Sequence, residues 1–233
     1  MLGHIKANRV IFLDIETAAC EPDFERLSEA MKRHWIARCG WQLKEKETPA
    51  TKFQAEAGLH SEFSKIICAV VGRLAQDKDG TWKLELKKLA DPSEAAILKE
   101  LSETLGKLPN DVWVAAYNGK GFDLPTVGRR MLVQGIPVPP VFDLSDKKPW
   151  ELRLLDPMEL FRFGERRPYC SMDLMATLMG IPSSKTGIKG EDVSRVYWEG
   201  GLGRIVEYCA ADVRVLAQIF LKMKELPIDL TVV

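Results

Sequence analysis

The chain has 233 residues, of which 46% are hydrophobic and 28% charged, the balance of an ordinary globular protein rather than a disordered or membrane protein. Its 33 basic and 33 acidic side chains cancel, so any binding of nucleic acid must come from local patches or metal ions. Five cysteines without CxxC spacing argue against a zinc site or a disulfide scaffold and favour a reducing, cytoplasmic compartment. The N-terminal apolar stretch is too short for a signal peptide, and we expect no membrane span.

We expect one α/β domain over residues 1–233, because α/β folds often reach this size as a single unit. A β-branched and apolar run at 9–15 has the pattern of a strand buried on both faces. Residues 21–62 differ in character, since an amphipathic, helix-like stretch at 25–38 leads into a polar segment rich in Lys and Glu. This composition predicts an insertion or lid-like excursion outside the core.

Two further runs, at 64–75 and 81–89, have the pattern of paired strands joined by a turn that contains Asp-Gly. A capping residue and an early acid near position 93 begin a helix that a glycine closes at Gly106. Strands and helices then alternate, with strands expected at 112–117 and 152–156 and helices at 124–134, 171–179, 190–198 and 202–224. Antiparallel strands followed by βαβ units predict a mixed central sheet with helices packed on it.

Asp14 and Glu16 stand two residues apart at the expected end of the first strand. Because successive strand residues alternate between faces, these two side chains point to the same face of the sheet and together can chelate one cation. An isolated Asp-x-Glu pair is common, however, and acids at a strand end often meet only solvent. The pair therefore becomes informative only in combination with other motifs.

Asp123 follows the strand expected at 112–117, after a loop with two glycines that let the backbone bend sharply toward a ligand. Two interpretations stay open for it, a ligand of the site or the N-cap of the next helix. Tyr208 and Asp212 lie four residues apart, so on a helix they share one face and address one site. Taken alone, they also fit a partly buried tyrosine and a solvated aspartate.

In combination, these residues resemble the DEDDy branch of the DnaQ-like 3′→5′ exonucleases, in the ribonuclease H-like superfamily. The family's motifs are Asp-x-Glu, an Asn several residues before Phe-Asp, and Tyr-x-x-x-Asp. They are matched in this order by Asp14 and Glu16, by Asn118, Phe122 and Asp123, and by Tyr208 and Asp212. Within the family, the chain is most similar to predicted exonucleases related to the proofreading domain of family B DNA polymerases. The resemblance implies a ribonuclease H-like mixed sheet over essentially the whole chain, with 21–62 as an insertion.

The resemblance also implies two divalent cations, Mg²⁺ or Mn²⁺, which are hard ions that prefer oxygen ligands. In this family pattern Asp14 bridges the two ions, Glu16 and Asp212 hold the ion that activates water, and Asp123 acts mainly through bound water on the second ion. Tyr208 is interpreted as a residue that aligns the attacking water, because an unperturbed phenol with a pKa near 10 is a poor base at neutral pH.

Three residues are implied on the substrate side. Thr17, with the backbone of Glu16, is expected to contact the 3′-hydroxyl of the terminal nucleotide, and Asn118 and Phe122 to contact the substrate. For Asn118 and Phe122 a packing role is an equal alternative. Phosphate contacts are sought among Lys120, Arg129, Arg130, Lys147, Lys148, Arg162, Arg166, Arg167, Lys185, Lys189 and Arg204, with stacking by Trp150, Phe161 and Phe163, although solvated surface charge is the simpler interpretation for most of the cations.

The expected partner is nucleic acid with a free 3′ end, DNA in preference to RNA, and no membrane. One alternative is an exoribonuclease of the same fold that trims RNA, because recognition of the 2′-hydroxyl depends on pocket shape. A second alternative is a non-catalytic module that binds nucleic acid. The intact acids and tyrosine argue against the second, since such a module has no physical need to keep clustered charges.

Overall fold

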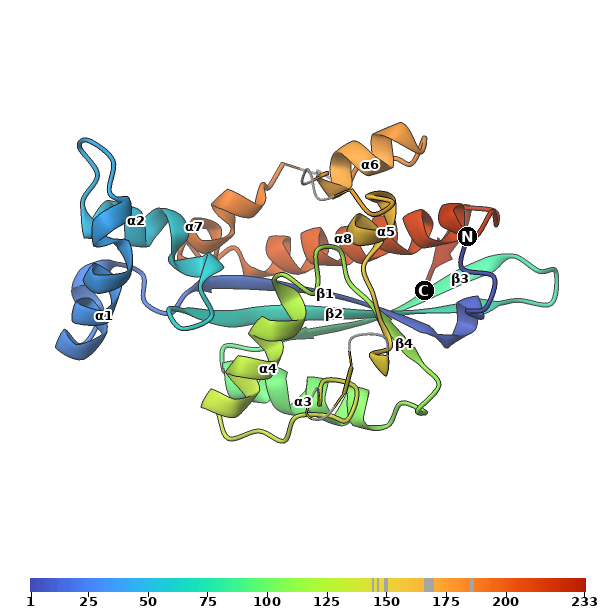
Figure 1. Cartoon of the computed structure of the whole chain (residues 1–233), viewed down its shortest axis with the longest axis horizontal. Coiled ribbons are helices and arrows are strands. Elements are labelled where there is room, and N and C mark those ends of the chain that lie inside the picture. The colour runs from blue at the N-terminus through green and yellow to red at the C-terminus, as the bar shows by residue number, and fades with distance from the viewer. Residues whose placement is uncertain (144, 146, 149–150, 166–169, 185–186) are drawn as a thin grey trace.

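A computed structural model describes residues 1–143, 145, 147–148, 151–165, 170–184 and 187–233 (Figure 1). Within this part of the chain, six strands form one sheet in the order β5-β4-β1-β2-β3-β6. They are β1 (Val10–Ala19), β2 (Ser64–Gln76), β3 (Trp82–Ala90), β4 (Trp113–Ala115), β5 (Leu154–Leu155) and β6 (Leu230–Val232). β1, β2 and β3 pair antiparallel, whereas β4, β5 and β6 each join a neighbour in parallel. The expected mixed sheet is confirmed.

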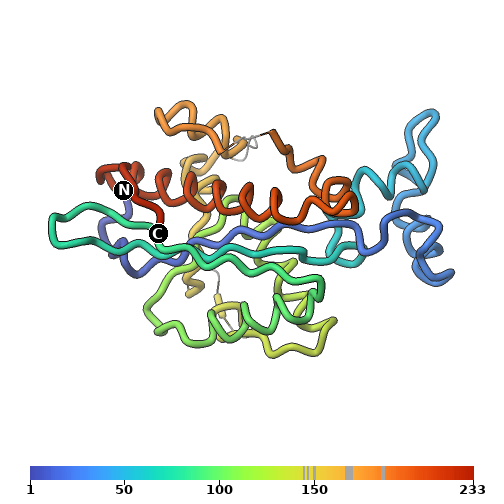
Figure 2. The backbone as a smooth tube through the Cα atoms, turned by 180° about the vertical axis from the view of Figure 1, so that it is seen from behind, coloured from blue at the N-terminus to red at the C-terminus, as the bar shows by residue number. Residues whose placement is uncertain are grey.

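Helices cover both faces of this sheet (Figures 1 and 2). The long α8 runs along one face with α5, α6 and α7 nearby, α3 and α4 cover the other face, and α1 and α2 extend beyond one end. Their bounds are α1 (Glu29–Cys39), α2 (Pro49–Glu56), α3 (Glu94–Gly106), α4 (Asp123–Val133), α5 (Pro157–Phe161), α6 (Met172–Leu178), α7 (Val193–Trp198) and α8 (Leu202–Met223). Short 3-10 turns are η1 (Ala7–Arg9), η2 (Phe24–Arg26), η3 (Gly40–Gln42), η4 (Ala57–Leu59) and η6 (Gly190–Asp192). Among the described helices, none has the length and apolarity needed to cross a bilayer.

The alternation of side chains along β1 divides the core between these two layers. Phe12 points toward α8, where its ring meets that of Phe220 edge-on with centroids 5.4 Å apart. Ile11 and Leu13 point the other way and pack in the cluster that contains the apolar residues of α3 and α4. Because both faces of β1 are covered, its first half, Val10 to Leu13, is a continuous apolar run, as the pattern predicted.

β1 is longer than the run expected at 9–15, since pairing with β2 continues to Ala19 beyond a register shift between Glu16 and Thr17. Asp14 and Glu16 were expected at the end of the strand, and this placement is wrong. They lie inside β1, where acids are uncommon, opposite Val70 and Cys68 of β2. The small residues after Glu16 gave no apolar signal of strand, and β2 supplies the hydrogen bonds that extend it.

Three short elements, α2, α5 and β6, were absent from the sequence-based expectation. α5 occupies five residues and begins at Pro157 behind the capping carboxylate of Asp156. β6 pairs in parallel with the start of β3, with Leu230 opposite Trp82, although the two strands are far apart in the sequence. Such pairing is a non-local contact, so a local pattern cannot reveal it.

Residues 21–62, expected to lie outside the core, contribute most of a small apolar cluster that the sequence analysis did not predict. Trp35 and Phe53 are fully buried with ring centroids 5.3 Å apart, and Trp35 Nε1 donates to the carbonyl of Pro49 at 2.8 Å. Ala19 and Phe63, from the ends of β1 and the segment that leads into β2, complete the cluster. The segment is therefore packed onto one end of the central strands.

A buried ion pair joins the two helices on the α3 face. Arg130 Nε donates to Glu94 Oε1 at 2.8 Å, and the Ile66 amide of β2 donates to the same oxygen at 2.8 Å. Gln134 Nε2 donates to Glu94 Oε2 at 2.7 Å, and Arg130 Nη1 donates to the carbonyl of Ser61 at 3.3 Å. The early acid expected in the helix thus connects β2, α3 and α4, and through Ser61 also the end of the 21–62 segment.

Replacing Arg130 by methionine is expected to lower the free energy of unfolding by about 3–5 kcal/mol, because the Glu94 charge is then left buried without its partner. The measurement is urea denaturation followed by circular dichroism. Arg129→Met is the matched control: Arg129 is an exposed neighbour on α4 that contacts Ser61 Oγ at 3.2 Å, and its loss should cost about 0.5 kcal/mol. Equal losses in the two variants would contradict the assigned role of the ion pair.

Candidate active site

The site forms where β4 separates from β1. β4 pairs with β1 only over Val10–Phe12, and after Ala115 the chain turns away through a loop into α4. This departure leaves the Ile15 amide of β1 without a β4 partner, and Asp123 Oδ1 accepts its hydrogen bond at 3.3 Å. The first residue of α4 is thereby fixed beside the acidic stretch of β1, with Phe122 rather than Asp123 at the N-cap position.

Carboxylates from β1 and α8 converge next to this point. Asp14 and Glu16 share the face of β1 that α8 covers, and Asp212 lies on α8 one turn after Tyr208. One oxygen from each of Asp14, Glu16 and Asp212 lies within 4.8 Å of the others. Asp123 stands outside this trio but is close enough for its charge to act on Asp14 and Glu16. The structure therefore brings all four predicted acids to one place.

Three of these acids, Asp14, Glu16 and Asp123, line a cavity of about 330 Å³. Four parts of the chain form its walls: β1, the loop between β4 and α4, the α2 and η4 region of the 21–62 segment, and the stretch from η6 to α8. The lining residues are Asp14, Ile15, Glu16, Thr17, Ala55, Gly58, Leu59, Tyr117, Asn118, Phe122, Asp123, Gly190, Glu191, Ser194 and Tyr208. No Lys or Arg stands among these described lining residues, so protein cations do not balance the acids at the wall.

Burial and mutual repulsion shift the acids strongly toward their protonated forms. Burial is the largest cause that raises the pKa of Asp14 well above its ordinary value, and repulsion by Asp212, Glu16 and Asp123 adds to it. Burial also raises the pKa of Glu16 well above its ordinary value, with further repulsion from Asp212 and Asp123. For Asp123, burial raises the pKa to about 7, although the Ile15 amide opposes the shift. A positive charge placed among these acids would therefore stabilise their ionised forms at neutral pH.

The donor set fits a hard divalent cation. Asp14 Oδ2 is buried and has no hydrogen-bond partner among the described residues, so one carboxylate oxygen is available at the centre of the trio. All four candidate ligands offer oxygen, the donor that Mg²⁺ and Mn²⁺ prefer. Cys209 lies nearby, but burial raises the pKa of its thiol, which donates to the backbone carbonyl of Asp14 at 3.4 Å. Among the described residues, the group of possible ligands that converges here holds three carboxylates and no thiol.

Tyr208 presents a neutral hydroxyl to the cavity. Burial is the largest cause that raises its pKa, and the charges of Asp212, Glu16 and Asp14 add to the shift. A phenol whose pKa is raised holds its proton throughout the neutral range. The side chain can therefore donate a hydrogen bond in the site, whereas it cannot accept a proton as a base.

The three predicted substrate-side residues all line the cavity, although one of them already has a structural partner. Thr17 is buried, and its Oγ1 donates to the Gly58 carbonyl at 2.6 Å. Its hydroxyl proton thus fixes η4 to β1. Asn118 has a positive φ of 53° at the turn after β4, and Phe122 precedes the helix that carries Asp123.

Asp156 is a residue of this region that sequence reasoning missed. It is buried at the end of β5, and its Oδ1 accepts from the Asn118 amide at 3.0 Å and from the Met158 amide at 3.1 Å. One carboxylate thus fixes the turn at Asn118 and caps α5. An acid directly after an apolar strand was the available signal, the same one that drew attention to Asp14.

Several of the basic residues considered for phosphate binding have protein partners. Lys120 Nζ lies 2.6 Å from Glu159, Lys147 Nζ donates to the Pro140 carbonyl at 3.1 Å, and Arg130 forms the buried pair described above. Three further basic candidates, Arg166, Arg167 and Lys185, lie outside the described residues, as does Trp150, which was considered for stacking. The observed pairs favour structural roles for the first group.

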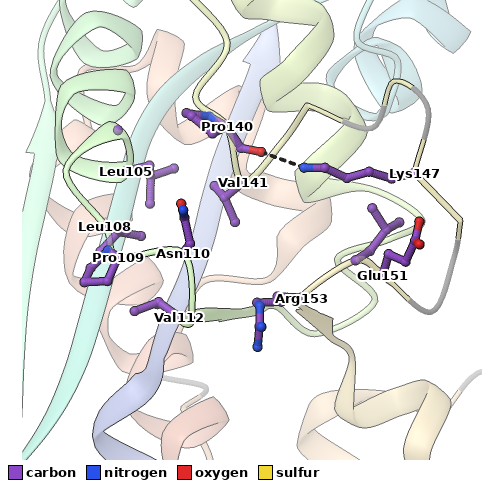
Figure 3. A pocket seen from close by; sticks show the side chains of 12 residues that line it. Leu105, Leu108, Pro109, Asn110, Val112, Pro140, Val141, Lys147, Glu151 and Arg153 are labelled. Carbon is purple, nitrogen blue, oxygen red and sulfur yellow. Dashed lines mark hydrogen bonds between the residues drawn. The ribbon is translucent and has the colours of Figure 1, made fainter.

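A second cavity, of about 400 Å³, lies between the end of α3 and the segment around 140–153 (Figure 3). Its charged lining residues are Lys147, Glu151 and Arg153. Glu151 Oε2 accepts from the Lys148 amide at 2.8 Å, and the Arg153 guanidinium lies 5.8 Å from the centre of the Trp113 ring. The described part of this cavity lacks the convergent carboxylates of the first, which makes the smaller cavity the candidate active site.

Comparisons with known proteins agree with this geometry. A family profile described as "Predicted 3'-5' exonuclease related to the exonuclease domain of PolB" matches residues 58–232, a range that includes Asp123, Tyr208 and Asp212 but not Asp14 or Glu16. Among solved structures, the family B DNA polymerase from the hyperthermophilic archaeon Pyrobaculum calidifontis is similar with a TM-score of 0.54 and 16% sequence identity. The similarity covers 96% of this chain and 25% of that chain, so the present chain spans about a quarter of the polymerase. No protein of curated function matches.

The raised pKa of Asp123 predicts how stability depends on pH in the presence of a chelator. A carboxyl group whose pKa is about 7 in the folded protein, against an ordinary 3.8, stabilises the fold fully below about 3.8 and loses that contribution as pH rises through about 7. Thermal unfolding in EDTA should therefore occur at lower temperature as pH increases across this range. Asp123→Asn, whose amide oxygen still accepts from Ile15, should show a flatter dependence.

Asp79→Asn, in the exposed turn between β2 and β3, is the matched control and should keep the slope of the parent protein. A slope that is unchanged by Asp123→Asn would show that Asp123 titrates normally in the folded protein.

Proposed function

Because the chain belongs to the family of predicted 3′-5′ exonucleases related to the exonuclease domain of PolB, we propose that it removes nucleotides from the 3′ end of single-stranded DNA with two divalent cations. The family confirms the resemblance drawn from the three motifs, and with it the class of enzyme and a nucleic acid substrate. The observation that carries the finer proposal is the convergence of Asp14, Glu16 and Asp212 within 4.8 Å, beside Asp123 and Tyr208.

The four acids are proposed to hold the cations. Asp14, which is repelled by each of the other three carboxylates, would contribute to holding both ions. Glu16 and Asp212 would hold one ion with it, and Asp123 would help to hold the second. Divalent cations in such a pair acidify a bound water, stabilise charge on the phosphate and favour departure of the 3′-oxygen.

Tyr208 is proposed to position the attacking water. Its hydroxyl faces the cavity, keeps its proton at neutral pH, and lies on α8 one turn before Asp212. A protonated hydroxyl at this place can donate to a water or to a phosphate oxygen and so fix the direction of attack. Acidification of the water itself then comes from the metal site and not from the phenol.

Single-stranded DNA is the substrate we propose. The polymerase of similar fold acts on DNA by its title, and the matched family is related to a polymerase exonuclease domain. The cavity has a volume at the low end of small-ligand pockets, which suits one terminal nucleotide better than a base pair.

The central experiment offers 5′-labelled single-stranded DNA and RNA of the same sequence to the purified protein with Mg²⁺, with Mn²⁺ and with EDTA. We expect a ladder that shortens from the 3′ end of DNA only when metal is present. Asp212→Asn should lower the rate about a thousandfold, since a ligand of the site is lost. Glu207→Gln, on the exposed side of α8 where Glu207 pairs with Lys88 at 2.7 Å, is the matched control and should cleave normally.

Faster shortening of RNA than of DNA would overturn the proposed substrate while keeping the enzyme class. Full activity in EDTA, or in Asp212→Asn, would overturn the metal mechanism.

Replacing Tyr208 by phenylalanine should lower kcat about tenfold or more, because the attacking water loses its alignment while the acids remain. The metal concentration at half-maximal activity should not change, since Tyr208 is not assigned as a ligand. Rates across a series of Mn²⁺ concentrations separate the two effects. A variant with normal kcat and a weakened metal response would show that Tyr208 acts on the cation site instead.

A further inference from the structure

One wall of the active-site cavity comes from the 21–62 segment and not from the sheet framework. Ala55 at the end of α2, together with Gly58 and Leu59 of η4, lines the cavity that also contains the acids. None of these three residues belongs to the family's catalytic motifs, and none has a polar side chain. This wall is therefore suited to the apolar part of a substrate.

Hydrogen bonds fix the backbone of this wall on both sides of Leu59. Before it, the Gly58 carbonyl accepts from Thr17 Oγ1 at 2.6 Å. After it, the His60 amide donates to the Ala57 carbonyl at 3.1 Å, and the Phe63 amide to the His60 carbonyl at 2.8 Å.

Packing adds to these bonds. Ala57 is fully buried against the cluster that contains Trp35 and Phe53, so packing also holds η4 in place. A wall held in this way keeps its place beside β1 and does not behave as a mobile lid.

The Leu59 side chain remains largely open to solvent on this fixed turn. It is 62% exposed, although Ala57 beside it is fully buried. Phe122, at the start of α4, contributes an aromatic ring to the same cavity from a separate element. Nucleobases have flat apolar faces that stack on such side chains regardless of their sequence. The acids and the cations that they would hold address phosphate, whereas Leu59 and Phe122 offer apolar surface suited to a base.

We propose that Leu59, with Phe122, receives the base of the 3′-terminal nucleotide, so that the 21–62 segment determines how firmly the substrate end is held. This inference rests on the proposed function, because it assumes that a 3′ end enters the cavity. Recognition of this kind discriminates a nucleotide that carries a base from one that lacks it, and is tolerant of which base is present.

The test compares single-stranded DNA with an ordinary 3′-terminal nucleotide and the same strand with an abasic 3′-terminal residue. The parent protein should cleave the ordinary end with a kcat/KM about tenfold higher, the effect expected of one stacked base. In Leu59→Ala, KM for the ordinary end should rise about fivefold or more, with kcat unchanged. The abasic end should be cleaved as by the parent protein.

Two controls complete the design. Leu59→Met keeps an apolar side chain and should retain the preference, whereas Leu132→Ala removes a leucine that is 71% exposed on α4 outside the cavity and should change nothing. The inference is overturned if Leu59→Ala keeps the full preference for the ordinary end, or if it weakens cleavage of both ends equally.

Fluorescence anisotropy of the same labelled strands separates this inference from the proposed function. If the parent protein binds the ordinary end more tightly than the abasic end, and Leu59→Ala loses the difference, the inference stands even when no cleavage occurs and the proposed function fails. Equal binding of the two ends by the parent protein would overturn the inference whatever the cleavage result.

Discussion

Electrostatic repulsion among buried carboxylates is the constraint on which the arrangement of this molecule depends. Asp14, Glu16 and Asp212 approach within 4.8 Å, and at that separation two full charges repel by on the order of 3 kcal/mol even with substantial screening. The fold opposes this repulsion by covering β1 on both faces and pairing most of its length with β2. α8, which brings Asp212, packs closely on the same strands. A cation bound between the acids would replace the repulsion between carboxylates by attraction of each carboxylate to the cation.

The position of the acids follows from an interruption in the sheet. β4 stops after Ala115, and the space beside the second half of β1 is filled by the start of α4 and by the turn at Asn118. The same interruption leaves the Ile15 amide without a strand partner, and this amide donates a hydrogen bond to Asp123 Oδ1. The Asn118 amide in the turn donates to Asp156 Oδ1. The cavity is thus a consequence of a strand that ends early, and the Ile15 amide that this leaves unpaired has a side-chain partner.

Local patterns predicted most of this framework, because long buried strands and amphipathic helices leave periodic signals in the sequence. The hairpin at 64–89 and the helix at 202–224 lie close to β2, β3 and α8, and the mixed sheet follows from their order. Elements that depend on distant partners were missed, as for β6 with its pairing to β3 and the extension of β1 to Ala19. The small core around Trp35 was missed for the same reason, since its apolar residues are scattered through a polar segment.

The candidate site was predicted unevenly. Motif order placed four acids and Tyr208 in one region. In the structure Asp14, Glu16, Asp123 and Tyr208 line one cavity, and Asp212 converges with Asp14 and Glu16 beside it. No local pattern indicates that the Thr17 hydroxyl contacts Gly58, that Asp156 supports the loop, or that Arg130 forms a buried ion pair. Each of these depends on which backbone group happens to lie opposite, and that information exists only in the folded chain. The roles of the acids and the tyrosine in catalysis remain predictions.

The single hydrogen bond from Thr17 to Gly58 joins two parts of the molecule that are stabilised in different ways. Each residue of β1 pairs with β2, packs on a covered face of the sheet or belongs to the acidic group, so few substitutions in β1 leave the structure unchanged. The turn on the other side of that bond contributes apolar surface and is supported by its own small core. Under our proposal that Leu59 on this turn receives the terminal base, substitutions there change which strand ends are accepted while the acids stay in place. The turn is therefore the position to vary in order to change the substrate range without changing the acids.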